Sequence, residues 1–156
     1  MKMLRKEKEI TDLGEIEAII HQSDVCRLAM ADAGGPYIVP LNFGFSENSL
    51  YFHSAHKGRK MDILKKNPRV CFEFDLGVRV ISGEKACDWG TYFKSVIGFG
   101  KAQFVNDIEA KKKALNIIMN HYAGKSFEFS GTDVDRVAII RVDIDQMTGK
   151  RAQAQG

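Results

Sequence analysis

Short strand-like segments that follow one another closely constrain the fold of this chain more than any other feature. Residues 25–31, 37–45 and 50–54 are rich in β-branched, aromatic and aliphatic side chains, and clusters of turn-forming residues separate them. Each separating turn is too short for the crossover connection that parallel strands need. The first third of the chain therefore predicts an antiparallel meander.

The rest of the chain contains further segments of both kinds. Thr11 or Asp12 can cap the first expected helix and Asp107 the last, and Pro68 ends the middle one. About six or seven strands with three helices between them lack the regular alternation of a βαβ protein. The pattern predicts a mainly β fold, an antiparallel barrel that is closed or partly closed, with flanking helices. The further expected strands are 70–75, 78–82, 93–105 and 136–145, and the expected helices are 13–21, 57–67 and 108–122.

Three residues interrupt the strand patterns. Pro40 lies inside the second strand and predicts either an edge strand or a bulge. Gly98 and Gly100 predict a sharp bend of a long strand or a close approach of another group to its backbone. No repeat or linker divides the sequence, so we expect a single domain over residues 1–156, with 147–156 as a flexible tail.

Composition narrows the function classes. The net charge of +3 is too small to predict a nucleic-acid partner, but its sign favours small anionic ligands such as phosphates. The three cysteines have no C-x-x-C spacing. Among the histidines only His53-x-x-His56 has a ligand-like spacing, and its basic neighbourhood would repel a cation, so we expect no metal site. No signal segment and no membrane-spanning apolar run are present, so we expect a cytoplasmic protein without a membrane partner.

The segment most informative about chemistry is 52–60, which reads Phe52-His53-Ser54-Ala55-His56-Lys57-Gly58-Arg59-Lys60. It joins an expected strand to an expected helix, whose first turn offers unpaired N–H groups and a positive dipole end. A hydroxyl, a guanidinium and ammonium groups around a glycine could cradle a phosphate. The alternative is a solvated basic helix face, because most charge runs are simply surface.

Other segments leave similar alternatives open. Pro40 and its neighbours could leave backbone groups free for a planar polar ligand, or could form an ordinary kinked edge strand. Trp89 and Tyr92 could stack on a flat ligand or serve packing alone. Cys87 could be a reactive thiol, although an inert cysteine is commoner.

Four motifs, taken in order along the chain, resemble those of the pyridoxamine 5′-phosphate oxidase-like flavoproteins, and within them the branch of the nitroimidazole-resistance reductases. The resemblance runs from about residue 5 to residue 151, so it covers almost the whole chain. The motifs are Pro40-Leu41-Asn42-Phe43, Phe52-His53-Ser54-Ala55 with Gly58 and Lys60, Asn67-Pro68-Arg69-Val70-Cys71-Phe72, and Ser95-Val96-Ile97-Gly98-Phe99-Gly100.

The resemblance implies a split-barrel homodimer that binds FMN at each of two sites between the subunits. Ser54, Arg59 and Lys60 would hold the phosphate of FMN, and His53 matches a histidine with a catalytic role in the nitroimidazole branch. The residues along the isoalloxazine ring or ribityl chain would be Val39, Pro40, Leu41 and Asn42, together with His53. Those near the flavin from this subunit or its partner would be Ser95, Val96 and Ile97.

The expected function is that of an FMN-dependent oxidoreductase that reduces a small acceptor, such as a nitro compound or a quinone. The C-terminal residues 147–152 lack the Arg-Leu-x-Pro-like segment with which true pyridoxamine-phosphate oxidases hold their substrate, so vitamin B6 is not the expected substrate. Two alternatives remain. One is a protein that stores or senses a flavin without catalysis, and the other is a haem protein on the same barrel with His53 or His121 as axial ligand.

Overall fold

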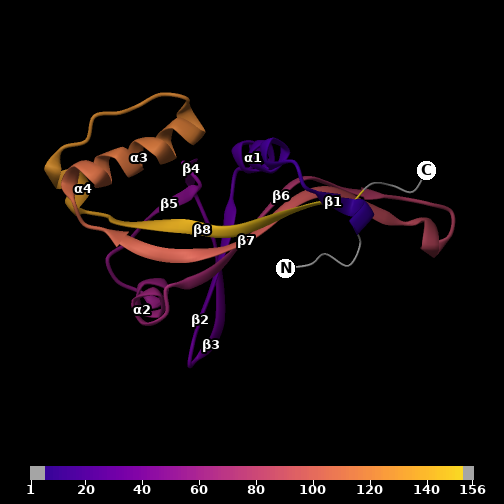
Figure 1. Ribbon diagram of the computed structural model, residues 1–156, viewed down its shortest axis with the longest axis horizontal. Helices are drawn as coiled ribbons and strands as arrows, with labels where there is room; N and C mark the ends of the chain where they lie inside the picture. Colours follow the sequence, from indigo (N-terminus) through magenta and orange to yellow (C-terminus); the bar gives the residue numbers. More distant parts are fainter. Residues whose placement is uncertain (1–5, 153–156) are drawn as a thin grey trace.

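One antiparallel sheet of eight strands dominates the computed structural model, which describes residues 6–152 (Figure 1). The strands lie in the order β3-β2-β6-β7-β8-β5-β4, and β1 pairs with β8 outside this path. Every pairing is antiparallel, as the short turns predict. The strands are β1 Glu9–Ile10, β2 Cys26–Asp32, β3 Gly35–Leu41, β4 Gly44–Ser46, β5 Ser49–Ser54, β6 Arg69–Ile81, β7 Gly90–Val105 and β8 Ala138–Ala152.

Four helices flank the sheet. The Asp12 carboxylate accepts a hydrogen bond from Glu15 N (2.9 Å), and Asp107 accepts one from Ala110 N (2.9 Å), so both predicted caps are confirmed. No helix within residues 6–152 is long and apolar enough to cross a membrane. The helices are α1 Leu13–Gln22, α2 Arg59–Lys66, α3 Ile108–Ala123 and α4 Gly131–Asp135, with short 3-10 turns at η1 Lys6–Lys8 and η2 Ala86–Asp88.

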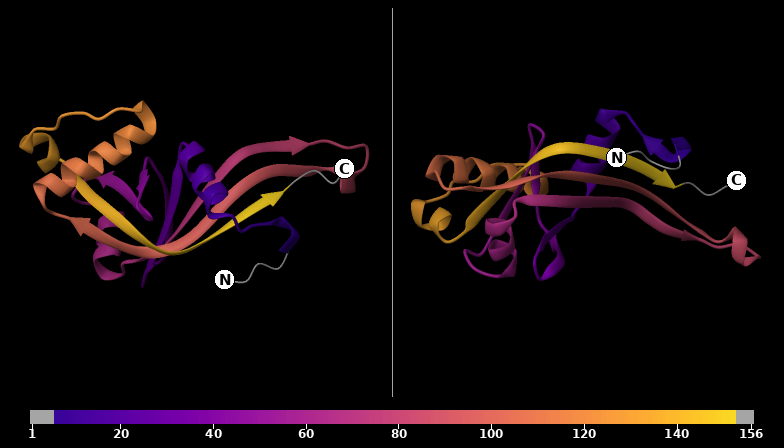
Figure 2. Two further views of the ribbon diagram at one scale, coloured as in Figure 1. Left: turned by 45° about the horizontal axis from the view of Figure 1, so that its top comes forward. Right: turned by 60° about the horizontal axis from the view of Figure 1, so that its bottom comes forward.

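The three long strands β6, β7 and β8 bend strongly, and this bend gives the sheet its half-closed shape (Figure 2). The pairing of β7 with β8 shifts register between Phe99 and Gly100, the bulge expected at this position. A Cβ at Gly98 would overlap the Phe72 ring, and one at Gly100 would lie 2.9 Å from Val142 Cγ1. The groups that approach Gly98 and Gly100 closely therefore belong to neighbouring strands of the same sheet. The half-closed antiparallel sheet is the predicted split barrel.

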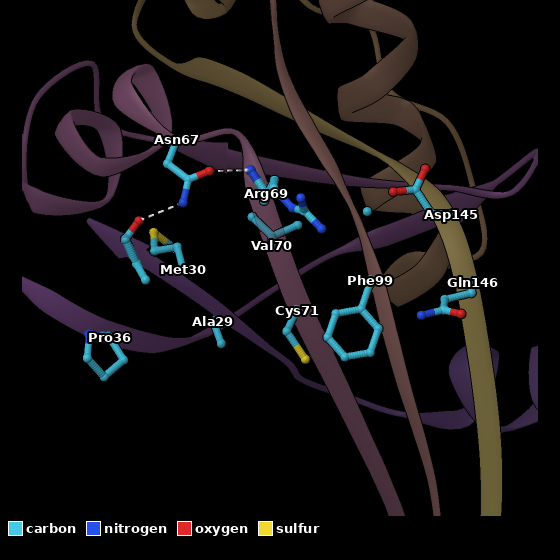
Figure 3. A pocket seen from close by; sticks show the side chains of 12 residues that line it. Ala29, Met30, Pro36, Asn67, Arg69, Val70, Cys71, Phe99, Asp145 and Gln146 are labelled. Carbon is cyan, nitrogen blue, oxygen red and sulfur yellow. Dashed lines mark hydrogen bonds between the residues drawn. The ribbon is translucent and has the colours of Figure 1, made fainter. Parts of the chain in front are cut away.

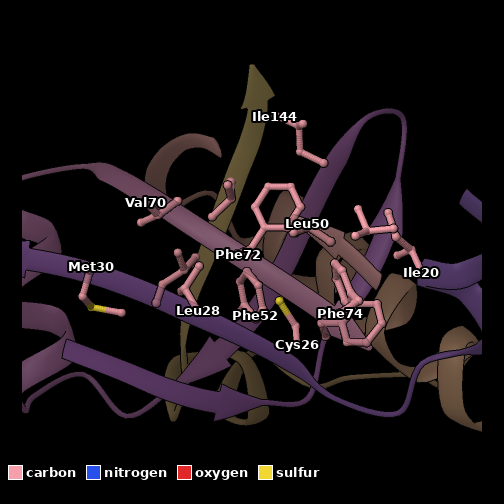
Figure 4. Close-up of a cluster of buried hydrophobic side chains, with 14 of the residues drawn as sticks. Ile20, Cys26, Leu28, Met30, Leu50, Phe52, Val70, Phe72, Phe74 and Ile144 are labelled. Carbon is pink, nitrogen blue, oxygen red and sulfur yellow. The ribbon is translucent and has the colours of Figure 1, made fainter. Parts of the chain in front are cut away.

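The core is a cluster of buried hydrophobic side chains from the strands of the sheet and from α1 and α2 (Figure 4). Its largest side chains are four phenylalanines that are completely buried, and the Phe43 and Phe74 ring centroids lie 4.8 Å apart. Helix α1 adds three isoleucines to this core, and α2 adds Met61, Ile63 and Leu64. The four phenylalanines are Phe43, Phe52, Phe72 and Phe74.

Three of the expected strands are arranged differently in the structure. The segment 37–45 is broken after Leu41, because Phe43 turns into the core and its N–H donates to the Tyr122 hydroxyl (3.1 Å). The segments expected at 70–75 and 78–82 are one strand, β6, and the gap between them is a register shift near Gly77, whose φ is 65°.

The flexible tail expected at 147–156 is wrong for its first six residues. Residues 147–152 belong to β8, where they pair with β7, and Gly149 also lies opposite Ile10 of β1. The remaining residues, 153–156, lie outside the part of the chain that the structure describes.

Pro40 lies on β3, an edge strand of the sheet, as predicted. It faces Arg27 of β2, and Pro36 of the same strand faces Ala31.

Candidate functional site

A hollow of about 470 Å³ lies between β3, the end of β5 and the start of α2. Strand alternation turns three side chains of β3 toward it, because Tyr37, Val39 and Leu41 share the face of β3 that packs on the core. The hollow brings together seven residues that the sequence assigned to a cofactor. It is lined by Tyr37, Val39, Pro40, Leu41, His53, Ser54, Ala55, Lys57, Gly58, Arg59 and Lys60.

The N-terminus of α2 forms one end of this hollow. Gly58 precedes the helix with a φ of 122°, a value that favours glycine, and no side chain caps the first turn. The longer helices α1 and α3, by contrast, are capped by the carboxylates of Asp12 and Asp107. The unpaired N–H groups of α2 therefore face a site where an anion is favoured.

Two cationic side chains, Arg59 and Lys60, lie in the first turn of α2. The Arg59 guanidinium lies over the ring of Tyr37, with its carbon 4.6 Å from the ring centroid. Lys60 is half-buried, and this burial lowers the pKa of its ammonium group. A bound anion would relieve the cost of keeping Lys60 charged there.

Ser54 and His53 of β5 also line the hollow. They are the last residues of β5 and pair with Ala138 and Ile139 of β8. His53 is exposed and lines the hollow. A hydroxyl and an imidazole therefore lie on the same hollow as the two cations of α2.

The other histidine considered as a haem ligand lies elsewhere. His121 is on α3, where its Nε2 donates to the carbonyl of Ser23 (2.8 Å) and its ring packs on Phe43. His56 also has a structural partner, because its Nε2 lies 2.7 Å from the carbonyl oxygen of Asp135. Of these three histidines, only His53 lines the hollow.

The remaining predicted residues do not line this hollow. Asn42 is exposed just beyond β3. Val96 is completely buried on the core face of β7, so its side chain is closed to a ligand in this subunit. Ser95 and Ile97 lie on the opposite, outer face of β7.

A row of outer-face residues nevertheless links Ile97 with Pro40. Pro40, Arg27, Glu73 and Ile97 lie directly opposite one another on successive strands. Arg27 forms ion pairs with Glu73 (3.2 Å) and with Asp75. Burial and the neighbouring Asp75 raise the pKa of Glu73, although Arg27 opposes this. The outer face thus carries a charge cluster among apolar neighbours.

Beside that row lies a second hollow, of about 630 Å³, which the sequence did not predict (Figure 3). Asn67 braces one side of it, since its amide donates to the Ala31 carbonyl (2.9 Å) and accepts from Arg69 N (3.1 Å). None of the predicted cofactor residues lines it. Its walls are Ala29, Met30, Ala31, Pro36, Asn67, Arg69, Val70, Cys71, Phe99, Gly100, Asp145 and Gln146.

Tyr37 is the lining residue that the sequence analysis missed most clearly. A signal was present, because Tyr37 shares the two-residue period of Val39 and Leu41 on an expected strand. Its relation to Arg59, which is 22 positions away (59 − 37), could not be read from that period.

Several known proteins are similar to this chain in sequence or in fold. The crystal structure of a proposed 5-nitroimidazole antibiotic resistance protein from Bacteroides thetaiotaomicron is 40% identical, with a TM-score of 0.83, over 92% of this chain and 86% of that one. A FAD-binding protein from Mesorhizobium loti is 26% identical, with a TM-score of 0.66, over 91% of this chain and 96% of that one. An uncharacterized protein of Rhizobium meliloti is 36% identical over 59 residues, which span only 38% of its length. The sequence model of the pyridoxamine 5′-phosphate oxidase family matches residues 12–151, and the chain therefore belongs to that family.

Proposed function

We propose that this protein binds FMN in the hollow between β3, β5 and α2 and uses it to reduce a small acceptor. One observation carries the proposal. The same hollow is lined by hydrogen-bond donors and cations suited to a phosphate, by one face of strand β3, and by a histidine. Ser54, Arg59, Lys60 and the uncapped start of α2 form the donor set.

The donor set fits a phosphate group on chemical grounds. Arginine offers two parallel N–H donors, lysine a point charge, and serine a hydroxyl donor. The half-buried Lys60 has no carboxylate partner among the ion pairs of the described residues, so an anionic ligand would supply one. Val39 and Leu41 add apolar surface along which a ring system and its ribityl chain could lie.

Bound FMN would supply hydride or electron transfer at its N5 atom, and the protein would bind, orient and electrostatically tune it. His53 lies on the same hollow and would donate a proton or a hydrogen bond to the acceptor. The 5-nitroimidazole resistance relative favours nitro compounds as candidate acceptors, with quinones next. The FAD-binding relative makes FAD the cofactor to compare with FMN.

The proposal includes a homodimer. The outer face of the sheet carries an apolar hollow and the exposed side chains of Ile38 and Ile97. A second copy that covered this face would bring the outer face of its own β7 toward the cofactor of the first. This arrangement would give Ser95 and Ile97 their expected place near the flavin, from the partner subunit. Light scattering combined with size-exclusion chromatography tests it.

The test of cofactor binding is a visible absorbance titration of the purified protein with FMN, FAD and haem. We expect flavin bands that shift on binding and tighter binding of FMN than of FAD. A protein that ignores both flavins would overturn the proposal, and a Soret band with haem would support the haem alternative.

Variants of α2 test the phosphate assignment. We expect Lys60→Ala to weaken FMN binding about tenfold or more, since hydrogen bonds to charged groups contribute about 1.5–3 kcal/mol. Lys66→Ala removes the same charge at the other end of α2 and is the matched control, expected to leave FMN binding unchanged. Equal affinities in the two variants would contradict the assignment.

Catalysis is tested by stopped-flow reduction with NAD(P)H followed by reoxidation with nitro compounds and quinones. His53→Asn is expected to slow acceptor reduction, measured with each variant saturated with FMN so that any change in FMN affinity is kept apart from the rate. Turnover with none of the acceptors would favour a protein that only stores or senses the flavin.

A further inference from the structure

Arg59 is held in place by an aromatic ring. Its guanidinium carbon lies 4.6 Å from the ring centroid of Tyr37, within the range of a cation–π interaction. Tyr37 belongs to the edge strand β3, and Arg59 is the first residue of α2, so the stack connects two walls of the hollow.

The surroundings give Arg59 few other reasons to adopt this position. None of the ion pairs formed within residues 6–152 involves Arg59. A cation in the first turn of a helix is also opposed by the helix dipole. Arg59 is exposed, and an exposed arginine samples many rotamers unless a contact restricts it.

We propose that Tyr37 is a positioning residue, which orients the Arg59 guanidinium toward the phosphate of FMN and thereby strengthens the preference for FMN over riboflavin. This inference rests on the proposed function. Tyr37 acts through Arg59, so its effect depends on the phosphate group, which riboflavin lacks.

A direct contact between Tyr37 and the flavin ring is the competing explanation, since both Tyr37 and Val39 line the hollow. The two explanations differ in one measurable quantity. A residue that acts through Arg59 changes the ratio of FMN affinity to riboflavin affinity. A residue that contacts the ring weakens both ligands equally and leaves the ratio unchanged.

The experiment measures dissociation constants for FMN and riboflavin by flavin fluorescence quenching, in the wild type and in four variants: Tyr37→Leu, Tyr37→Phe, Arg59→Gln and the double variant of Arg59→Gln with Tyr37→Leu. We expect Tyr37→Leu to lower the affinity ratio about two- to fivefold, as loss of an exposed cation–π contact predicts. Tyr37→Phe keeps the ring and should retain the wild-type ratio. In an Arg59→Gln background, Tyr37→Leu should change the ratio no further.

Riboflavin binding serves as an internal measure of the folded fraction, because a partly unfolded variant would lose both ligands together. An unchanged affinity ratio in Tyr37→Leu would overturn the inference while leaving the proposed function intact. An equal effect in the presence and absence of Arg59 would also overturn it. A wild-type protein that binds neither flavin would overturn the proposed function and this inference with it.

Discussion

The packing around β7 leaves no room for a side chain at Gly98, and Gly98→Ala tests this constraint. A Cβ at this position would overlap Cζ of Phe72 and lie 2.6 Å from its Cε2 and 2.8 Å from the carbonyl oxygen of Gln146. Phe72 is completely buried and packs against Phe74, with ring centroids 5.9 Å apart. The ring therefore has little room to move away.

Extra atoms in a well-packed core usually cost about 1–3 kcal/mol in the free energy of unfolding. We expect Gly98→Ala to fall in the upper half of this range, at about 2–3 kcal/mol, since a rigid ring and a strand carbonyl both oppose the new methyl group. Urea denaturation followed by circular dichroism measures the change. Gly131→Ala is the control, because a Cβ at Gly131 in α4 meets no heavy atom within 4 Å.

A second variant identifies the clash itself. Leucine lacks the ring atoms that a Cβ at position 98 would overlap, so the cost of Gly98→Ala should fall to about half in a Phe72→Leu background. A cost below about 0.5 kcal/mol in the wild-type background, the size of a typical surface substitution, would refute the reasoning. Strict additivity of the two substitutions would refute the role of Phe72.

Three further predictions concern charge and capping. FMN affinity should fall as the pH rises through the lowered pKa of Lys60, because the neutral amine attracts the phosphate less. Riboflavin has no phosphate, so its affinity should not fall over the same pH range. Lys60→Arg should abolish the fall in FMN affinity in titrations up to about pH 10. Glu73 has a raised pKa in the folded state, so the folded protein binds more protons and its free energy of unfolding should decrease as the pH rises from about 4.3 through the raised value. Urea titrations of the wild type and Glu73→Gln should therefore differ in pH slope over this window, and parallel curves would contradict the shift. Asp107→Ala removes the cap of α3 and should cost about 1 kcal/mol in the same assay, whereas Asp107→Asn should cost much less.

Much of the fold was predictable because its signals are local. Aspartates at positions 12 and 107 cap the helices that follow them, and alternation of side chains in β2, β5 and the first part of β6 marks their buried faces. The hollow was predictable in part for the same reason, since Ser54, Arg59 and Lys60 are close in sequence. At the helix caps, in these strands and at the start of α2, residues that are near one another in sequence are also near one another in the structure.

The misses involve contacts between distant parts of the chain. The second half of β8 is polar in sequence, and it becomes a strand because β7 pairs with it along its whole length. Helix α4 has only five residues, and its boundaries depend on the Ser130–Asp133 capping box and on the completely buried Val134. The capping box is itself a local signal that the sequence analysis did not use, whereas the pairing of the second half of β8 leaves no local pattern.

The two prolines of β3 limit the pairing that this edge strand can offer to another strand. Exposed edge strands tend to add strands from other molecules, because their free N–H and C=O groups are templates for pairing. Pro36 and Pro40 lie four residues apart on β3, so the donors missing at both positions belong to the same edge of the strand. Strand-to-strand growth from one molecule to the next, and with it one route to aggregation, is therefore disfavoured at β3.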